Sequence, residues 1–475
     1  MTQQVKRIKF GTDGWRGIIA DDFTFANVEK VTQAVSDYFL KDSDPGQVSI
    51  VVGYDTRFLS KEFAQLVSRI LAANGIKVFL SDTFVPTPVV SFTAKHLKLT
   101  AGVMVTASHN PPIFNGIKIK NSFGGAMDIE GTSAVEKLID KNPLKILSFE
   151  EALSRGLIQG KDLTVSYKEF LGSYVDIEKI RNSSFKVLVD FMYGSASQIL
   201  PSLLADSSIK LHLLHADKDP SFGERHPEPI FANLQELSER LRKEHYDIGL
   251  ALDGDGDRIA GMLPGGEFLH PQKILPLLML HLAKNRNWKG GVVKTVCGSQ
   301  LIDRVAKDLG IEIYETPVGF KYISELMQTK SILTGGEEAG GIGFKNYIPE
   351  RDGSLAGLLL LEMMAYENEG IQEILDKVEA QYGRFYYLRK DFRLEKMPLK
   401  SLDSVDFPEK LLDEQVEHKN DMDGIKLIAK DGSWLMFRLS GTESLVRIYA
   451  ETDDLTKAEQ LIELGTDLIK RASSS

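Results

Sequence analysis

A single hydroxyl group stands in a short polar loop where an apolar segment ends. Residues 106–111 read Thr-Ala-Ser-His-Asn-Pro and follow residues 99–105, whose composition is typical of a buried strand. In open α/β sheets, ligands bind at the carboxyl ends of strands, so Ser108 is a candidate nucleophile or phosphate carrier. Serine, asparagine and proline are also common in turns. For this loop by itself, the sequence leaves a strand-ending turn and a reactive serine equally open.

Three carboxylates follow a second strand-like segment. Asp253, Asp255 and Asp257 alternate with glycines directly after residues 248–252, so the backbone can bend and bring the carboxylates together. At ~5 Å and an effective dielectric constant of ~20, each pair repels by roughly 3 kcal/mol, and a divalent cation removes that cost. Oxygen ligands favour Mg²⁺ over zinc. A solvated acidic turn is the alternative. An EF-hand is excluded, because Arg258 and Pro264 replace its required glycine and glutamate.

Two further loops have the composition of anion sites. Residues 10–17 are glycine-rich and contain Arg16. Residues 437–447 combine two arginines and two hydroxyls around a glycine: Arg438, Ser440, Gly441, Thr442 and Arg447. Arginine binds phosphate bidentately, and a glycine turn can present backbone N–H groups to an anion. Each loop alone is more often an ordinary turn, and neither matches a Walker A or dinucleotide-binding pattern.

Residues 334–343 form a glycine-rich loop around two carboxylates, Glu337 and Glu338. Such a pair suits hydrogen bonding to sugar hydroxyls, although a turn with solvated acids would have the same sequence. Lys321 lies shortly before this loop and could meet a phosphate, but an ordinary surface lysine is the more common case.

The composition is that of a globular protein. The 475 residues are 43% hydrophobic and carry a net charge of −10, which does not favour non-specific nucleic-acid binding. The first ten residues lack the apolar core of a signal peptide, and the apolar segments 274–282 and 355–361 are too short to span a bilayer. The single cysteine, Cys297, excludes an intrachain disulfide framework and a cysteine-rich zinc site. We therefore expect a cytoplasmic protein with no nucleic-acid or membrane partner.

Three segments repeat the order strand, small-residue turn, helix, strand. They begin near residues 48, 185 and 291, and this shared pattern predicts three related α/β domains. After residue 402 the pattern changes to short strands near 425–429, 434–439 and 445–451 and a closing helix over 455–472, which predicts a smaller α+β domain. Breaks in composition place the four domains at 1–160, 161–264, 265–383 and 384–475, so that each domain carries one of the loops around Ser108, Asp255, Glu337 and Arg438.

Taken together and in order, these motifs resemble the α-D-phosphohexomutase superfamily, which includes phosphoglucomutases, phosphomannomutases and phosphoglucosamine mutases. Thr-Ala-Ser-His-Asn-Pro and Asp-Gly-Asp-Gly-Asp-Arg are the most specific segments, and the resemblance runs from residues 10–17 to 437–447. It implies mixed sheets in the first three domains and a central cleft, in agreement with the organisation above. It also implies Mg²⁺ as cofactor, glucose 1,6-bisphosphate as activator and phosphosugars as substrates.

The resemblance implies a role for each loop. Ser108 would carry the phosphoryl group as phosphoserine and would also be a ligand of the Mg²⁺ held by the three aspartates. Around the reacting phosphate it implies Arg16, His109 and Lys118, the last a candidate general base, with Arg258 near the metal. The sugar and the non-reacting phosphate would be bound by the remaining set: Lys321, Glu337, Ala339, Arg438, Ser440, Gly441, Thr442 and Arg447.

The implied chemistry moves one phosphoryl group between serine and sugar. Such transfer requires positioning and neutralisation of charge, which a cation and nearby arginine and lysine side chains provide. Phosphoserine would donate to a sugar monophosphate, the 1,6-bisphosphate would turn around in the cleft, and the other phosphate would return to Ser108. A Ser–His–Asp hydrolase is the main competing use of this serine, and its Gly-x-Ser-x-Gly elbow is absent.

Departures from the family pattern lie in the substrate loops. Ala339 replaces a frequent serine, Gly341 replaces a histidine found in some relatives, and Leu439 and Ser444 replace frequent prolines. Because the residues implied in the chemistry are intact, we expect an enzyme rather than a silent sugar-phosphate sensor. We expect it to interconvert glucose 1-phosphate and glucose 6-phosphate, with mannose phosphates as the near alternative. Phosphoglucosamine is less expected, because the sugar-loop pattern is not matched.

A second alternative uses the same residues differently. A glucose-1,6-bisphosphate synthase would charge Ser108 from another phosphosugar and release the bisphosphate. For the assembly, both a monomer and a homodimer are open.

Overall fold

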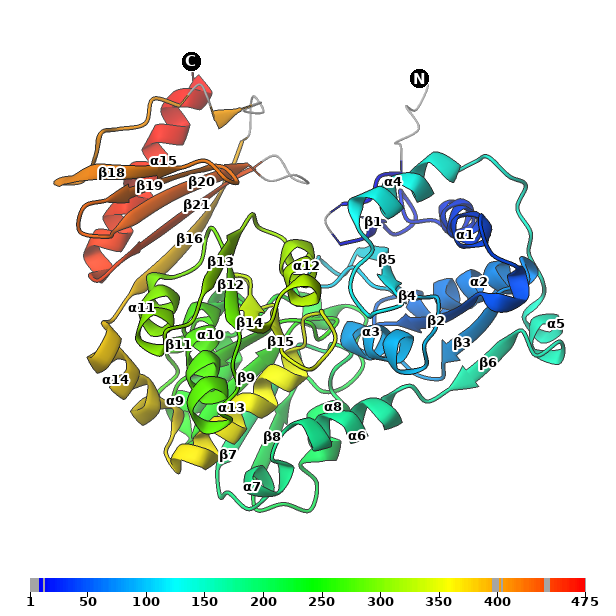
Figure 1. The fold of residues 1–475 in the computed structure, drawn as a ribbon, viewed down its shortest axis with the longest axis horizontal. Coiled ribbons are helices and arrows are strands. Elements are labelled where there is room, and N and C mark those ends of the chain that lie inside the picture. Colours follow the sequence, from blue (N-terminus) through cyan, green and yellow to red (C-terminus); the bar gives the residue numbers. More distant parts are fainter. Residues whose placement is uncertain (1–7, 12, 395–400, 403–404, 440–444, 475) are drawn as a thin grey trace.

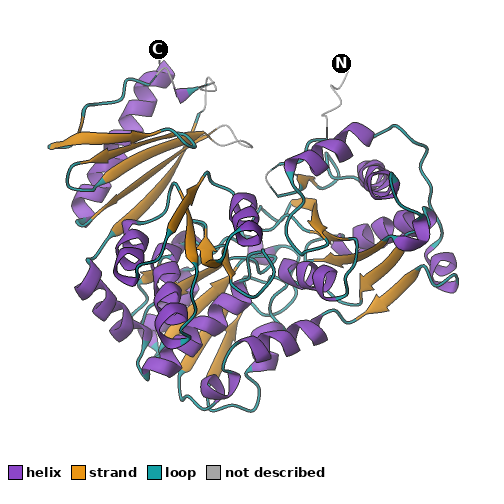
Figure 2. Cartoon of the chain, viewed as in Figure 1, coloured by secondary structure: helices purple, strands orange, loops and turns teal. Residues whose placement is uncertain are grey.

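The computed structural model describes residues 8–11, 13–394, 401–402, 405–439 and 445–474. Within them, four units follow one another along the chain, each built around its own sheet (Figure 1). The first and fourth units lie at the two ends of an arc, and the second and third lie between them. Figure 2 shows helices against the sheets of all four units. The predicted α/β fold class, with a separate C-terminal α+β unit, is confirmed.

The first unit has a six-stranded mixed sheet in the order β1-β5-β4-β2-β3-β6. Strands β2, β3, β4 and β6 are parallel, whereas β5 is antiparallel to both β4 and β1. The central strands β2 and β4 are buried almost throughout, which explains their uninterrupted apolar sequences. The strands are β1 (Trp15–Ile18), β2 (Ser49–Tyr54), β3 (Lys77–Ser81), β4 (Ala101–Val105), β5 (Phe114–Asn121) and β6 (Ile158–Lys161). The helices are α1 (Phe25–Leu40), α2 (Ser60–Ala73), α3 (Thr87–His96), α4 (Ile129–Leu138) and α5 (Phe149–Ser154).

The second unit has a five-stranded sheet in the order β11-β10-β9-β7-β8. Strand β7 is parallel to β8 and β9, and β10 turns back antiparallel to β9, so the Asp253 loop is a tight reversal at the end of a buried strand. The strands are β7 (Lys186–Asp190), β8 (Lys210–Leu214), β9 (Ile248–Leu252), β10 (Ile259–Met262) and β11 (Phe268–Leu269). The helices are α6 (Thr164–Tyr174), α7 (Ile177–Arg181), α8 (Ile199–Leu203) and α9 (Gln235–Lys243).

The third unit has a four-stranded sheet in the order β13-β12-β14-β15, in which only β15 is antiparallel to its neighbour. Helix α11 begins at the Ser299 cap, whose side chain accepts the N–H of Leu301, and ends at Gly310. The strands are β12 (Gly291–Thr295), β13 (Ile313–Thr316), β14 (Ile332–Gly336) and β15 (Ile342–Phe344). The helices are α10 (Pro271–Leu280), α11 (Gln300–Leu309), α12 (Phe320–Thr329), α13 (Gly353–Glu367) and α14 (Ile371–Tyr382).

The fourth unit has an antiparallel six-stranded sheet in the order β16-β21-β20-β19-β18-β17, packed against one long helix. It has a hydrophobic core of its own and meets the third unit through a smaller apolar cluster that includes Val296, Trp434 and Met436. The elements are β16 (Tyr386–Arg393), β17 (Lys410–Leu411), β18 (Glu414–Asn420), β19 (Ile425–Ala429), β20 (Trp434–Leu439), β21 (Leu445–Thr452) and α15 (Leu455–Ser474).

Two elements of the third and fourth units have irregular neighbours. Helix α10 ends at Leu280, and the chain continues as a wider π turn, His281–Asn285. Helix α14 ends at Tyr382, and strand β16 begins at Tyr386. Short 3₁₀ turns complete the fold at Pro45–Gln47, Phe222–Glu224 and Phe231–Asn233. No helix in the described part of the chain is long and apolar enough to cross a membrane.

Candidate active site

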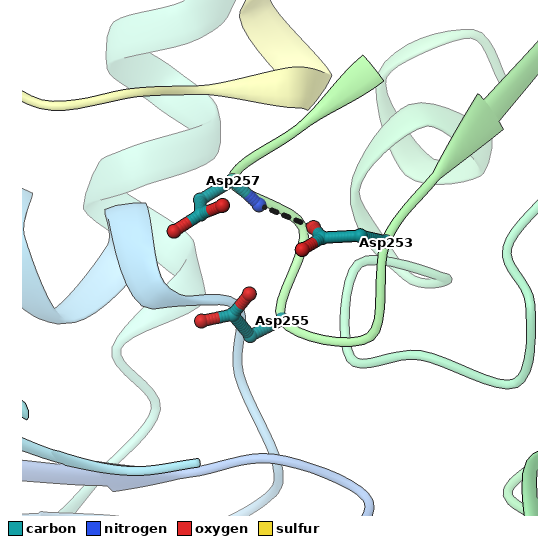
Figure 3. A group of neighbouring side chains, drawn as sticks. All are labelled: Asp253, Asp255 and Asp257. Carbon is teal, nitrogen blue, oxygen red and sulfur yellow. Dashed lines mark hydrogen bonds between the residues drawn. The ribbon is translucent and has the colours of Figure 1, made fainter. Parts of the chain in front are cut away.

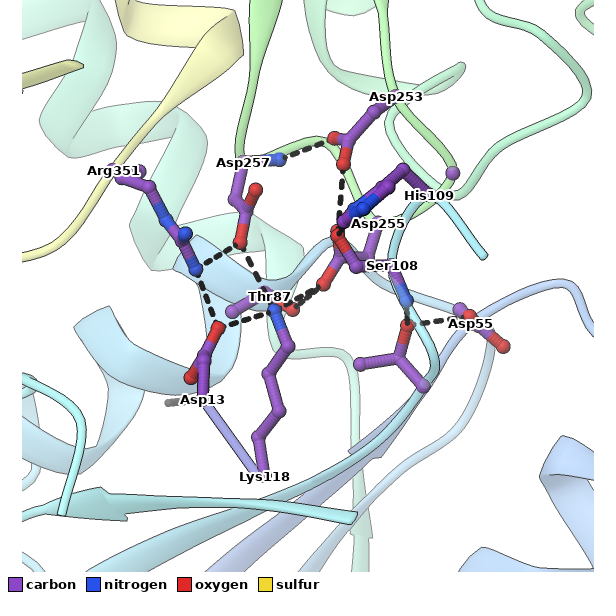
Figure 4. Close-up of polar contacts among 12 residues, drawn as sticks. Asp13, Asp55, Thr87, Ser108, His109, Lys118, Asp253, Asp255, Asp257 and Arg351 are labelled. Carbon is purple, nitrogen blue, oxygen red and sulfur yellow. Dashed lines mark hydrogen bonds and ion pairs between the residues drawn. The ribbon is translucent and has the colours of Figure 1, made fainter. Parts of the chain in front are cut away.

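Ser108 lies in the loop between β4 and β5 and is 1% exposed. Its Oγ donates a hydrogen bond to Asp253 Oδ2 at 3.0 Å and lies 3.4 Å from His109 Nδ1. Its backbone φ is +53°, in the left-handed region that residues other than glycine rarely adopt. The hydroxyl therefore points at the carboxylate loop of the second unit, an arrangement that a plain strand-ending turn does not require (Figure 4).

The three carboxylates converge, as their spacing predicts. Asp253, Asp255 and Asp257 lie in the turn between β9 and β10, are fully buried, and each offers an oxygen within 4.8 Å of the other two (Figure 3). Both intervening glycines are needed. Gly256 has a φ of +69°, and a Cβ on Gly254 would lie 2.6 Å from the carbonyl oxygen of Ser108.

This cluster fits a divalent cation. Within the described residues, the buried Oδ1 atoms of Asp255 and Asp257 accept no hydrogen bond. Burial, and then repulsion from the two neighbouring aspartates, raises the pKa of Asp253 well above its usual range. Oxygen ligands with excess negative charge suit Mg²⁺, which the three aspartates would hold beside the hydroxyl of Ser108.

Lys118 supplies positive charge to the same cluster. It is buried on β5, and its Nζ lies 2.9 Å from Asp13, 2.8 Å from Asp255 and 3.0 Å from Asp257. Burial lowers the pKa of Lys118, but attraction to these three carboxylates outweighs it and raises the pKa above its usual value. With these partners Lys118 is protonated, which suits contact with a phosphate. A role as general base requires the carboxylates to be neutralised first.

Arg351 joins three of the four units at this cluster, although no sequence pattern predicted a role for it. The guanidinium NH2 pairs with Asp13 and lies 2.7 Å from Asp257 Oδ2 (Figure 4). NH1 donates to Glu337 Oε2 at 3.2 Å. Arg351 follows β15 in a Pro-Glu-Arg-Asp-Gly segment that matches none of the patterns used above. The only sequence signal is that Arg351 stands between two acidic residues, Glu350 and Asp352.

Gly341 makes room for Arg351. A Cβ on Gly341 would lie 2.3 Å from Arg351 Cδ and 3.1 Å from Glu337 Oε2. The space into which a side chain at position 341 would extend is therefore filled by the arginine. The absence of a histidine here, noted from the sequence, accompanies a cationic side chain that arrives from another segment.

Arg16, His109 and Arg258 surround the same loops. Arg16 lies on β1 and donates through NH1 to Asn110 Oδ1. The pKa of His109 lies well below its usual value, first because of burial and then because of nearby cations that include Arg258 and Arg16, so the ring is neutral near pH 7. The backbone N–H of Arg258 donates to Asp253 Oδ1 at 3.1 Å. Arg258 also forms an isolated antiparallel β-bridge with Gly341.

The residues predicted to bind the sugar are only partly brought together. Glu337 lies in the turn between β14 and β15 and reaches the carboxylate cluster through Arg351, and Ala339 lies two residues further on. Lys321 lies on α12, where its Nζ sits 4.7 Å from the ring centre of Tyr322. Glu338 is buried, 3.4 Å from the hydroxyls of both Thr295 and Tyr449.

The two arginines of the last loop lie side by side. Arg438 and Arg447 are direct partners across β20 and β21. Arg438 Nε donates to Asp423 Oδ2 at 2.8 Å, and Arg447 Nε lies 4.0 Å from Asp391. Ser440, Gly441 and Thr442, predicted between them, lie outside the described residues.

Comparison with known families assigns the chain. Four models match in sequence: phosphoglucomutase/phosphomannomutase alpha/beta/alpha domain I over residues 7–145, domain II over 165–266, domain III over 270–382 and the C-terminal domain over 404–464. A phosphoglucomutase/phosphomannomutase of Thermococcus kodakarensis is 30% identical over 98% of both chains. The chain belongs to the phosphoglucomutase/phosphomannomutase family. It is thus a phosphohexomutase, an intramolecular phosphotransferase of a Mg²⁺-dependent superfamily.

The relatives differ in the sugar that their names give. A phosphoglucosamine/phosphogalactosamine mutase of Sulfurisphaera tokodaii is 30% identical, over 95% of this chain and 97% of the relative. A crystal structure described as a phosphomannomutase, from Thermus thermophilus, superposes with a TM-score of 0.86 at 33% identity and covers 98% of this chain and 99% of that one. These phosphohexomutases share the fold, but no single sugar. The alternative of a glucose-1,6-bisphosphate synthase receives no support from them.

Proposed function

We propose that this phosphohexomutase interconverts hexose 1-phosphate and hexose 6-phosphate, with glucose phosphates as the leading substrates and mannose phosphates as the near alternative. The observation that carries the proposal is the hydrogen bond of 3.0 Å from Ser108 Oγ to Asp253, which brings a buried hydroxyl to the edge of a convergent carboxylate cluster. Relatives named for glucosamine keep that sugar as a substrate to test.

In this proposal, Ser108 carries the phosphoryl group and exchanges it with either end of the sugar. A Mg²⁺ ion held by Asp253, Asp255 and Asp257 neutralises phosphate charge when bound. Lys118 and Arg16 approach the reacting phosphate from the first unit, and neutral His109 lies beside the hydroxyl. Because these groups are already positioned, little reorganisation accompanies the transfer.

The proposal extends to the sugar and to the second phosphate. Glu337, Ala339 and Lys321 bind the sugar, and Arg438 and Arg447 hold the phosphate that is not reacting, together with Ser440, Gly441 and Thr442. Adjacent arginines on one strand pair form a broad cationic site rather than one shaped for a single ester. Such a site accepts the phosphate in either orientation of the bisphosphate. A trace of glucose 1,6-bisphosphate then acts as activator, because it phosphorylates Ser108.

The test follows substrate conversion by ³¹P NMR in the presence of Mg²⁺. Glucose, mannose and glucosamine 1-phosphates are offered separately, each with and without a catalytic amount of the corresponding 1,6-bisphosphate. We expect conversion to the 6-phosphate, fastest for glucose, and stimulation by the bisphosphate. No conversion of any of the three sugars would overturn the proposal, and a faster mannose or glucosamine reaction would reassign the substrate.

A variant of the phosphoryl carrier tests the mechanism. Ser108→Ala removes the acceptor oxygen, so we expect turnover to fall to background and intact-protein mass spectrometry to show no phosphate addition after incubation with bisphosphate. Ser173→Ala, at an exposed serine on α6, is the matched control and retains both properties. Turnover of Ser108→Ala near that of the control would rule out the phosphoserine route.

A further inference from the structure

A buried arginine from another segment of the first unit forms hydrogen bonds with the loop that carries Ser108. Arg57 follows β2 in the segment Asp55-Thr56-Arg57, about fifty residues before the loop. Its guanidinium donates four hydrogen bonds, all to backbone carbonyl oxygens. NH2 donates to Ser108 and Asn110, each at 2.6 Å, and NH1 donates to Pro111 at 2.8 Å and Phe114 at 2.9 Å. All four acceptors lie within residues 108–114.

Asp55 binds the same loop through the hydroxyl of Thr106. Its Oδ2 accepts the hydroxyl of Thr106 at 2.6 Å, and Thr106 Oγ1 in turn accepts the backbone N–H of Ser108 at 2.9 Å. Asp55 Oδ1 is held by the hydroxyl of Ser60 at 2.7 Å, and Asp55 also lies 3.2 Å from Arg57 Nε. Both backbone polar groups of Ser108 are therefore bound by side chains, one leading to Asp55 and one to Arg57.

This support matters because the backbone of Ser108 is in an unfavourable conformation. A φ of +53° is costly for a residue with a Cβ, and it persists only where surrounding contacts impose it. The same conformation directs Oγ toward Asp253, 3.0 Å away. Without four bound carbonyls and a bound N–H, the loop could relax to a commoner conformation and turn the hydroxyl away from the carboxylates.

The second unit covers this support. The ring of Phe222 lies 4.9 Å from the guanidinium carbon of Arg57, and Thr56 Oγ1 donates to the carbonyl of Tyr193 at 2.9 Å. Arg57 is fully buried as a result, so its donors have no water to bind and depend on the loop carbonyls. Within the described residues, no hydrogen bond or ion pair joins Arg57 to the triad, so its direct contacts with the site are those with the backbone of the serine loop.

We propose that Arg57, together with Asp55, is a positioning residue for phosphoryl transfer: it holds the serine loop so that Ser108 Oγ remains at the carboxylate cluster in both directions of transfer. The inference rests on the proposed function. Arginine suits this role because its planar group presents five donors on three nitrogens, whereas lysine presents one nitrogen. A lysine at position 57 keeps the charge beside Asp55 and cannot reach all four carbonyls.

The first test compares Arg57→Lys with Arg69→Lys. Arg69 lies half-buried on α2 of the same unit and donates to one loop carbonyl, that of Leu147, at 2.8 Å, which makes it a matched control. We expect kcat of Arg57→Lys to fall roughly 10²-fold, because displacement of a reacting group by about 1 Å costs that much, with KM nearly unchanged. We expect Arg69→Lys to keep both constants. Equal kcat losses in the two variants would overturn the inference.

A second variant guards against a folding defect. Thr106→Val keeps the shape of the side chain and removes only the hydroxyl, which links the N–H of Ser108 to Asp55, so we expect kcat to fall about tenfold, the factor that corresponds to about 1.4 kcal/mol. Full kcat in Thr106→Val together with full kcat in Arg57→Lys would show that the loop needs neither support.

Hydrogen exchange supplies a readout that does not depend on turnover. We expect amides in a peptide spanning residues 106–116 to exchange faster in Arg57→Lys than in the wild type, while the β2 and α2 peptides are unchanged. Unchanged exchange at 106–116 would overturn the inference even if the enzyme is an active mutase. If the wild type converts no hexose phosphate, the proposed function fails, and the exchange result still decides whether Arg57 holds the loop.

Discussion

At the scale of single residues, Gly341 and Arg351 form one unit of the site. A Cβ on Gly341 would lie 2.3 Å from Arg351 Cδ, so any side chain at 341 must displace the arginine that pairs with Asp257 and Glu337. The absence of a histidine at this position therefore has a structural consequence. The guanidinium of Arg351, which stays charged at all accessible pH values, occupies the space that a histidine ring at position 341 would need. The charge next to Glu337 therefore does not change with pH.

This close packing predicts that introducing a histidine at position 341 lowers both stability and activity. In Gly341→His we expect the free energy of unfolding to fall by about 1–3 kcal/mol from overpacking, and kcat to fall because Glu337 loses its arginine partner. Urea unfolding and the ³¹P assay measure the two effects. Gly46→His is the control, since nothing lies within 4 Å of a Cβ at Gly46. Activity of Gly341→His equal to that of the control would contradict the steric argument.

The residues of the site differ in how far their sequence could predict them. Ser108 and the three aspartates follow apolar strands, at the ends where α/β sheets bind ligands, so local sequence made each a candidate, and the family resemblance connected them. Arg351 and Arg57 act across the fold. Their importance arises from burial and from carbonyl or carboxylate partners that are distant in sequence, and no local pattern encodes those contacts.

At the scale of elements, the docking of strand β21 on helix α11 joins the fourth unit to the third. Glu451 of β21 is buried, and its Oε1 accepts the Ser299 hydroxyl at 2.9 Å and the Gln300 N–H at 3.0 Å, at the first turn of α11. Burial raises the pKa of Glu451 to about 7, and these two hydrogen bonds oppose the rise only in part. The interface thus contains an acid that is half-protonated near neutral pH.

The raised pKa of Glu451 predicts that its contribution to the free energy of unfolding falls as pH rises toward neutrality. Between its usual pKa of about 4.3 and its folded value of about 7, folded Glu451 keeps a proton that the unfolded chain has released. The free energy of unfolding therefore decreases across this window, by at most about 4 kcal/mol. In Glu451→Gln, which retains an acceptor oxygen, we expect a smaller loss of thermal midpoint between pH 5 and pH 7.

The control for this titration is Glu459→Gln, at an exposed position on α15. Lys426, also buried in this interface, has its pKa lowered to about 8 by burial, so it stays charged throughout the chosen window and does not contribute to the difference. Equal pH dependence in Glu451→Gln and Glu459→Gln would mean that Glu451 ionises as freely in the folded chain as in the unfolded one.

Strands could be predicted from the sequence where all their side chains are apolar. The repeated strand–helix–strand segments appear as β2, β7 and β12 with their helices, because buried parallel strands are apolar throughout. Strands β5 and β18 were missed for opposite reasons. Strand β5 buries Lys118 and Lys120 among carboxylates, and the sequence Glu-Gln-Val-Glu-His-Lys-Asn of β18 is largely exposed. Polar residues interrupt the apolar alternation in both.

At the scale of the whole molecule, one network of buried charges crosses three units. The first unit contributes Asp13 and Lys118, the second Asp255 and Asp257, and the third Arg351. The two charges of the first unit cancel, whereas the second unit contributes two negative charges and the third one positive charge, so the surplus lies on the carboxylates of the second unit. A group that neutralises this surplus also attaches the second unit to its neighbours, because Ser108 of the first unit contacts Asp253, and Lys118 contacts Asp255 and Asp257.

A divalent cation should therefore stabilise the fold as a whole. A ligand present at one hundred times its dissociation constant adds about 2.7 kcal/mol to the free energy of unfolding, which raises the midpoint by roughly 5–10 °C for units of this size. We expect Mg²⁺ to raise the thermal midpoint of the wild type by such an amount. In Asp255→Asn the rise should shrink, because one ligand loses its charge while its shape remains.

Asp467→Asn, at an exposed position on α15, controls for general effects of removing a carboxylate, and EDTA should reverse the rise in the wild type and in this control alike. Without added metal, Asp255→Asn should unfold at or below the wild-type midpoint, since the loss of the buried ion pair with Lys118 outweighs the relieved repulsion with Asp253, although Thr87 still has an oxygen to donate to. A rise with Mg²⁺ that is the same in all three proteins would place the stabilising cation elsewhere. A rise confined to chains with three aspartates would locate it between the first and second units, where the proposed phosphoryl transfer takes place.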